Sequence, residues 1–93
     1  MAEQHTDPNE SPLKFPCKFP IKVMGRNADD FATLVADIVR RHVPASDVLD
    51  IATRESRENR FLSVSVTITA TSRQQLDALY SELTACEHVL MAL

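Results

Sequence analysis

The ten residues from Phe61 to Ala70 alternate between two kinds of side chain, and they constrain the fold more than any other part of the sequence. One side of this run is aliphatic throughout: Leu62, Val64, Val66, Ile68 and Ala70. The other side is mostly hydroxyl-bearing: Phe61, Ser63, Ser65, Thr67 and Thr69. A period of two residues is typical of a β-strand with one buried face. The run therefore predicts a long central strand whose aliphatic face must be covered by helices.

A helix precedes this strand. Its apolar stripe has the spacing i, i+3, i+4, i+7, i+8, i+11 and consists of Phe31, Leu34, Val35, Ile38, Val39 and His42. The stripe predicts an amphipathic helix over about residues 28–43. Asn27 is placed to cap its N-terminus, Asp29 and Asp30 suit the positive end of the helix dipole, and Pro44 stops it.

A second helix follows the strand, with a shorter stripe formed by Leu76, Leu79, Tyr80 and Leu83. We expect it to begin at a cap provided by Thr71 or Ser72 and to end near Cys86. Residues 72–75, with Ser72 and Gln75 at the two ends, fit a capping box.

Three weaker runs predict further strands: residues 21–24 ended by Gly25, residues 47–56 and residues 88–93. Residues 57–60 predict a hairpin turn in which Asn59 adopts a positive φ. Pro20 cannot donate a ladder hydrogen bond, so we expect the first strand to begin pairing after it.

The resulting order is strand, helix, strand, strand, helix, strand. Two such βαβ halves predict a ferredoxin-like α+β sandwich, with a four-stranded antiparallel sheet and both helices on one face. Its usual strand order, 4-1-3-2, places the long third strand in the centre. We expect residues 15–93 to form this single domain. Residues 1–14 are poor in apolar side chains and predict a disordered tail.

Composition excludes several classes of function. A single glycine cannot supply a phosphate-binding P-loop or a dinucleotide fingerprint, each of which needs several. A net charge of −3 disfavours a nucleic-acid binder, and Phe61 alone cannot provide the stacking face of an RNA recognition motif. No segment resembles a signal peptide or a membrane span, so we expect a cytoplasmic protein with no membrane association and two reduced cysteines.

The candidate reactive residues do not form a complete site in the sequence. Cys86 and His88 supply too few ligands for zinc, so we expect no metal and no cofactor. His42, on the stripe of the first helix, fits a structural position better than a catalytic one. Cys17 lies near Lys18 and Lys22, but neither a partner base nor an oxyanion site accompanies it. We therefore expect no enzyme active site here.

Several short motifs resemble the YbeD-like family of small bacterial proteins. The most specific is residues 22–25, Lys-Val-Met-Gly; the others are Phe15-Pro16 with Phe19, Val39 with His42 and Pro44, residues 63–68 with Ala70-Thr71, Leu79-Tyr80 with Leu83, and Val89, Met91 and Leu93. The resemblance covers residues 15–93 and implies a ferredoxin-like fold similar to ACT regulatory domains, without implying an activity. The family usually has glycine where Asn59 stands, and often tyrosine where Phe61 stands.

The loop containing Gly25, Arg26 and Asn27 is the sharpest candidate ligand site. It joins a strand to a helix N-terminus, and Arg26 offers a bidentate contact to an anion. In ACT-like domains a loop at this place contacts effectors, and in acylphosphatases it holds phosphate. The same residues also fit a purely structural role, in which Gly25 supplies a positive φ and Asn27 a helix cap.

The sheet face away from the helices is a candidate partner surface. We expect it to present Lys22, Met24, Ser63, Ser65, Thr67 and Thr69, together with apolar residues of the last strand. Such a face, or an exposed edge strand, suits a weak homodimer or a protein partner. The sequence thus favours a non-enzymatic regulatory or binding module that senses a small anionic metabolite or docks a partner. The alternatives are an acylphosphatase-type hydrolase and a structural adaptor.

Overall fold

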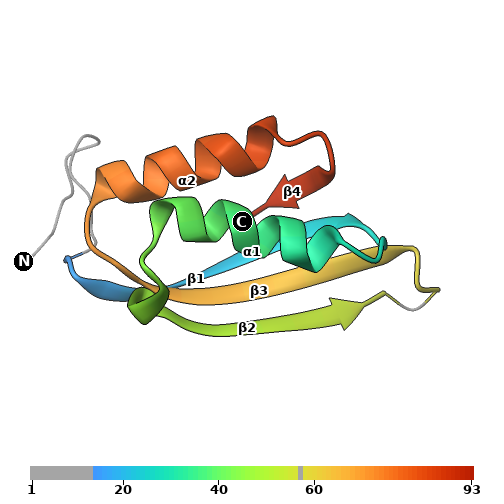
Figure 1. Ribbon diagram of the computed structural model, residues 1–93, viewed down its shortest axis with the longest axis horizontal. Coiled ribbons are helices and arrows are strands. Elements are labelled where there is room, and N and C mark those ends of the chain that lie inside the picture. The colour runs from blue at the N-terminus through green and yellow to red at the C-terminus, as the bar shows by residue number, and fades with distance from the viewer. Residues whose placement is uncertain (1–13, 57) are drawn as a thin grey trace, which may run out of the picture.

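A computed structural model describes residues 14–56 and 58–93 (Figure 1). The elements are β1 (Cys17–Arg26), α1 (Phe31–His42), the short 3-10 helix η1 (Ala45–Asp47), β2 (Val48–Glu55), β3 (Phe61–Ala70), α2 (Arg73–Ala85) and β4 (Val89–Ala92). The four strands form one antiparallel sheet in the order β2-β3-β1-β4, and both helices lie on the same side of it. The predicted ferredoxin-like βαββαβ sandwich and its strand order are therefore confirmed. The predicted tail, apart from Lys14, and position 57 of the predicted turn lie outside the described residues.

The core lies between the helices and the central strands. The five aliphatic residues of β3 are at most 8% exposed, as their alternation predicts. Both helical stripes cover them with buried side chains: Phe31, Val35, Ile38, Val39, Leu76, Leu79 and Leu83. Each fully buried aliphatic side chain contributes roughly 1.5–3 kcal/mol. Every buried side chain of the described residues is apolar, so the polar chemistry of the protein lies at its surface.

β1 is longer than predicted and includes Pro20. Pairing with β3 begins at Cys17, opposite Ala70, and Pro20 lies opposite Thr67. The expectation that pairing starts after Pro20 is therefore wrong. Lys22 exchanges backbone hydrogen bonds with Leu93 on the β4 side of β1. Because backbone groups alternate in direction along a strand, the nitrogen of Pro20 faces that same side, beyond the end of β4, where no ladder partner is lost.

α1 begins at Phe31, three residues later than expected, and its N-cap position is Asp30, which makes no side-chain capping bond. Asp29 and Asp30 precede the first turn instead of lying in it. Asn27 is not a cap. Its backbone N–H donates to the Arg60 carbonyl oxygen at 2.9 Å, and its side-chain amide donates to the Asn59 carbonyl oxygen at 2.9 Å. Asn27 therefore binds the β2–β3 hairpin instead of capping α1, the role that its place in the sequence predicts.

α2 begins at the predicted N-cap, Ser72, whose hydroxyl oxygen accepts a hydrogen bond from the Gln75 N–H at 3.0 Å. The reciprocal bond differs from a capping box, because the Gln75 side chain accepts from the N–H of Thr71 at 2.8 Å. The same side chain also donates to the carbonyl oxygen of His42 at 3.0 Å. Gln75 thus joins the start of α2 to the end of α1.

The β2–β3 hairpin turns at Asn59, whose φ of 59° confirms the predicted left-handed conformation. In the part of the chain that the structure describes, no helix is long and apolar enough to cross a membrane.

Candidate functional site

Gly25 lies where β1, α1 and the start of β4 meet. Its φ is not positive, so the expectation that it supplies a positive φ and ends the strand is wrong; β1 continues through Arg26. A Cβ at this position would overlap the Phe31 ring and would lie 2.5 Å from the His88 carbonyl oxygen. Glycine is required here because one aromatic ring and one backbone carbonyl group occupy the space that a Cβ would need.

A cavity of about 310 Å³ opens directly beside this junction. Its lining comes from both ends of the chain: Arg26, Ala28, Asp30, Phe31, Leu34, Glu87, His88 and Leu90. A volume near 300 Å³ is at the lower end of the range for small-molecule sites, which corresponds to a ligand of metabolite size.

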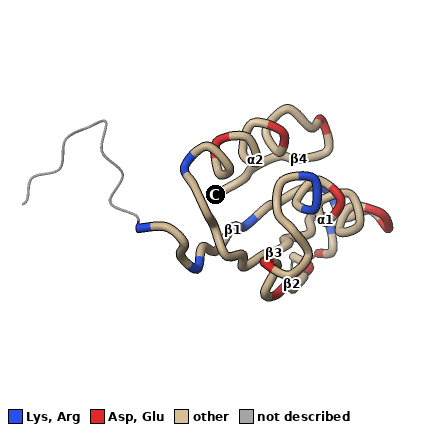
Figure 2. Tube along the Cα trace, turned by 60° about the vertical axis from the view of Figure 1, so that its left-hand side comes forward, with Lys and Arg blue, Asp and Glu red and all other residues tan. Residues whose placement is uncertain are grey.

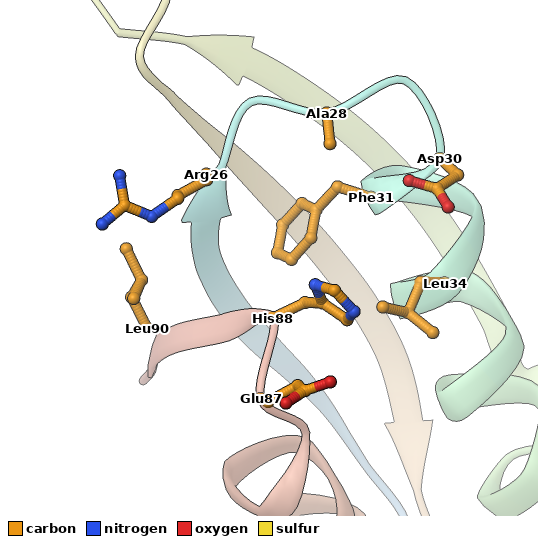
Figure 3. A pocket seen from close by; sticks show the side chains of 8 residues that line it. All are labelled: Arg26, Ala28, Asp30, Phe31, Leu34, Glu87, His88 and Leu90. Atoms are coloured by element: carbon orange, nitrogen blue, oxygen red, sulfur yellow. The ribbon is translucent and has the colours of Figure 1, made fainter.

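The cavity combines an apolar floor with charged groups at its margin. In Figure 3 the Phe31 ring and the His88 imidazole lie at the centre, Arg26 and Leu90 lie on one side, and Leu34 lies on the other. Arg26 is exposed and forms no ion pair within residues 14–56 and 58–93, so its guanidinium is available for a ligand. The carboxylates of Asp30 and Glu87 contribute negative charge at the rim.

The three residues of the predicted loop site separate in the structure. Arg26 lines the cavity, and Gly25 lies buried beside it, against Phe31 and His88. Asn27 is not part of the lining, because its polar groups bind the hairpin. Glu87, His88 and Leu90 complete the cavity from the other end of the chain. Their proximity to Arg26 depends on the pairing of β4 with β1 and has no signature in the local sequence.

A second polar cluster joins the two helices and shares no residue with the cavity lining. Glu82 accepts hydrogen bonds from Arg41, and its other carboxylate oxygen lies 2.7 Å from His42 Nε2. The hydrogen bonds from Arg41, followed by the one from His42, lower the pKa of Glu82 below its usual value. The Glu82 carboxylate correspondingly raises the pKa of Arg41. His42 thus has a structural partner, and the cluster ties α1 to α2.

Both cysteines are free and half-buried. No group of three or more metal-ligating side chains occurs among the described residues.

The predicted partner surface forms one continuous face, which we call the open face. Register places Lys22 opposite Ser65 and Met24 opposite Ser63, and Thr67 and Thr69 continue the same side of β3. β4 adds Met91, which is 49% exposed and opposite Met24. Leu93, which follows β4 and exchanges backbone hydrogen bonds with Lys22, is 67% exposed. Blue segments along β1 in Figure 2 mark the basic residues of this strand, of which Lys18 and Lys22 are exposed on the open face. The face is therefore basic along β1 and apolar toward β4.

Fold comparison defines the class of protein. The structure is similar to the solution structure of a protein from H. pylori, with a TM-score of 0.71 and 13% identity, covering 100% of this chain and 98% of that one. It is also similar to the ACT domain of the GTP pyrophosphokinase of Chlorobium tepidum, with a TM-score of 0.66 and 10% identity over 82% of this chain and 94% of that domain. The protein is thus a ferredoxin-like α+β sandwich of the ACT-like type.

Sequence comparison then gives the family. Residues 10–93 match the family described as "Protein of unknown function (DUF493)". A UPF0250 protein of Chromobacterium violaceum is 44% identical over 88 residues, which cover 95% of this chain and 99% of that protein. Another from Pseudomonas aeruginosa is 45% identical over 82 residues, 87% of this chain and 88% of the relative. The chain belongs to the DUF493 (UPF0250) family of small bacterial proteins, which confirms the YbeD-like resemblance.

Proposed function

We propose that the protein is a non-enzymatic binding module whose ligand is a small anionic metabolite held in the cavity beside Gly25. The observation that carries the proposal is the position of Arg26, an exposed cation at the margin of a cavity with an apolar floor, which forms no ion pair with another described residue. The ACT-like fold of the protein is compatible with a regulatory role of this kind.

The lining selects for one kind of anion. A carboxylate accepts two parallel hydrogen bonds from a guanidinium such as Arg26. Phe31, Leu34 and Leu90 offer apolar contact to the remainder of the ligand. Asp30 and Glu87 repel a multiply charged group, so a singly charged carboxylate with a short apolar body fits better than a polyphosphate.

The test is an NMR titration of the ¹⁵N-labelled protein with butyrate and phenylacetate, with inorganic phosphate as a comparison anion. We expect the amides of Gly25, Phe31 and His88 to shift with the carboxylates. Arg26→Gln should weaken binding at least about tenfold, because a hydrogen bond to a charged group contributes about 1.5–3 kcal/mol. Arg73→Gln removes the same charge from the surface of α2 and is the matched control. Unchanged cavity amides at about 10 mM ligand would contradict the proposal.

A second function, docking of a protein partner on the open face, is supported by the exposed Met91 and Leu93 beside Lys22. Met91→Ser combined with Leu93→Ser should abolish capture of such a partner and leave the carboxylate titration unchanged. Capture that survives this double change would contradict docking at this face.

The competing hypothesis of acylphosphatase-type hydrolysis has a separate readout. Asn27 is held by the hairpin, and the cavity presents no residue arranged to activate water beyond His88 and the rim carboxylates. We therefore expect hydrolysis of an acyl phosphate to be indistinguishable from buffer. A rate that disappears in Arg26→Ala would favour the enzyme instead.

A further inference from the structure

β2 is an edge strand of the sheet (Figure 1). None of its eight residues is buried, and Ile51 remains 39% exposed although it lies on the same side of the sheet as the helices. Edge strands of natural proteins are commonly blunted by proline, charged side chains, a β-bulge or a covering segment. β2 has a register shift between Val48 and Asp50 and carries charged side chains, but its regular part, residues 50–55, contains neither proline nor lysine.

The outward backbone groups of β2 follow from one hydrogen bond. The Ser56 N–H donates to the Phe61 carbonyl oxygen, toward β3. Because direction alternates along the strand, the backbone N–H and C=O groups of Arg54 and Ala52 also point toward β3, whereas those of Thr53 and Ile51 point away from it. No described residue binds these outward groups, so they can form a ladder with another strand.

The charged residues of β2 are placed so that the strand is complementary in charge to an antiparallel copy of itself. Asp50 and Arg54 lie at equal distances on either side of Ala52, and register with Thr67 and Ser63 of β3 places both on the open face. Both are exposed, and neither forms an ion pair within the described parts of the chain. A second copy of β2, antiparallel and centred on Ala52, would place each Asp50 opposite Arg54 of the other copy.

In this register the backbone directions and the charge pairing are consistent with each other. Ala52 opposite Ala52 is a non-hydrogen-bonded pair, as its inward backbone groups require. Ile51 opposite Thr53 is then a hydrogen-bonded pair, which uses the outward groups. Asp50 opposite Arg54 is again non-hydrogen-bonded, the type of pair in which side chains approach most closely. On the helix side, the two exposed Ile51 side chains become diagonal neighbours across the two-fold axis.

We propose that the protein self-associates through β2, as a two-fold symmetric dimer in which two four-stranded sheets join into one continuous sheet centred on Ala52. The occupant of the edge is a second copy, because the charge pattern is self-complementary and an isologous contact requires that property. The contact is limited to one edge, so the dimer is weak. It is independent of the cavity, since no cavity residue lies on β2.

Sedimentation equilibrium of the whole protein, up to about 1 mM, tests the proposal through charge reversal. Arg54→Asp and Asp50→Arg should each weaken self-association at least about tenfold, because two attractive cross-strand pairs become two repulsive ones. An equimolar mixture of the two variants should form a heterodimer, in which both pairs are attractive again. The double variant Asp50→Arg/Arg54→Asp should recover the homodimer.

Lys22→Asp is the matched control, because it reverses a charge on the open face, in the same cross-sheet row as Ala52 but on β1. It should leave self-association unchanged, and circular dichroism should confirm that all variants fold. Amide exchange of Ile51 and Thr53 should slow with protein concentration in the wild type. A wild type that stays monomeric at about 1 mM overturns the proposal. Self-association lost in Lys22→Asp and kept in Arg54→Asp overturns it also, in favour of the open face.

Discussion

Substitution of Gly25 by alanine distinguishes two explanations for this glycine, because they predict opposite changes in the free energy of unfolding. The φ of Gly25 is not positive, so alanine is compatible with the backbone. On that ground alone, Gly25→Ala should stabilise the protein by about 0.4–1 kcal/mol, because alanine restricts the unfolded chain. The new methyl group would, however, overlap the Phe31 ring and stand 2.5 Å from the His88 carbonyl oxygen.

The steric term should prevail. Phe31 is 2% exposed and packed within the core, and the carbonyl belongs to backbone, so neither has room to withdraw. Inserting volume into a packed interior costs about 1–3 kcal/mol. For a domain of this size that free energy lowers the melting temperature by about 4–24 °C. The displaced β4 should also disturb the cavity and weaken carboxylate binding.

Thermal and urea unfolding followed by circular dichroism measure the change. Ser65→Thr, which adds one methyl group at an exposed position of β3, is the control and should stay within about 0.5 kcal/mol. Phe31→Leu in the Gly25→Ala background should recover part of the loss, with a coupling free energy of at least about 0.5 kcal/mol. A stabilised Gly25→Ala protein would refute the account of Gly25 as the point of closest approach.

Two further predictions concern the surface. Arg41 and His42 lower the pKa of Glu82, so the stability that this carboxylate contributes is present above its ordinary pKa of 4.5 and is lost as the pH falls through the lower folded value. In the Glu82→Gln variant, urea unfolding measured as a function of pH should lose this acid-dependent part of the stability. An unchanged pH profile would contradict the role of Glu82. The second prediction concerns Asn59. Asn59→Ala should destabilise the hairpin by about 1 kcal/mol because alanine tolerates a φ of 59° poorly, whereas Asn59→Gly should be neutral or stabilising. Equal melting temperatures of the two variants would argue against a conformational role of Asn59.

Elements with a local signal were predictable from the sequence. The alternation in β3 and the stripe of α1 predict which side of each element is buried, because both patterns place the apolar side chains on one face. Ser72 and Asn59 were identified because capping and left-handed turns depend on neighbouring backbone atoms alone.

The errors all concern contacts between distant segments. Pro20 is tolerated in β1 because β4 ends at the level of Lys22, which no local pattern encodes. Asn27 has the composition of a cap but binds the hairpin instead. Gly25 is required by the approach of Phe31 and His88 and not by its own dihedral angle. Of the eight residues that line the cavity, the predicted loop site contains only Arg26, and Glu87, His88 and Leu90 reach Arg26 only after the sheet has formed.

Pro20 has a consequence for the size of any assembly. If two copies join through β2, the outer borders of the combined sheet are formed by β4 and by the part of β1 that extends past it. On that exposed stretch of β1, one of the alternating outward positions is Pro20, which has no N–H to offer to an arriving strand. A strand that arrives along this part of the border would therefore lose one ladder hydrogen bond at Pro20. Pro20 thus disfavours the addition of further copies at the part of the border that β1 forms.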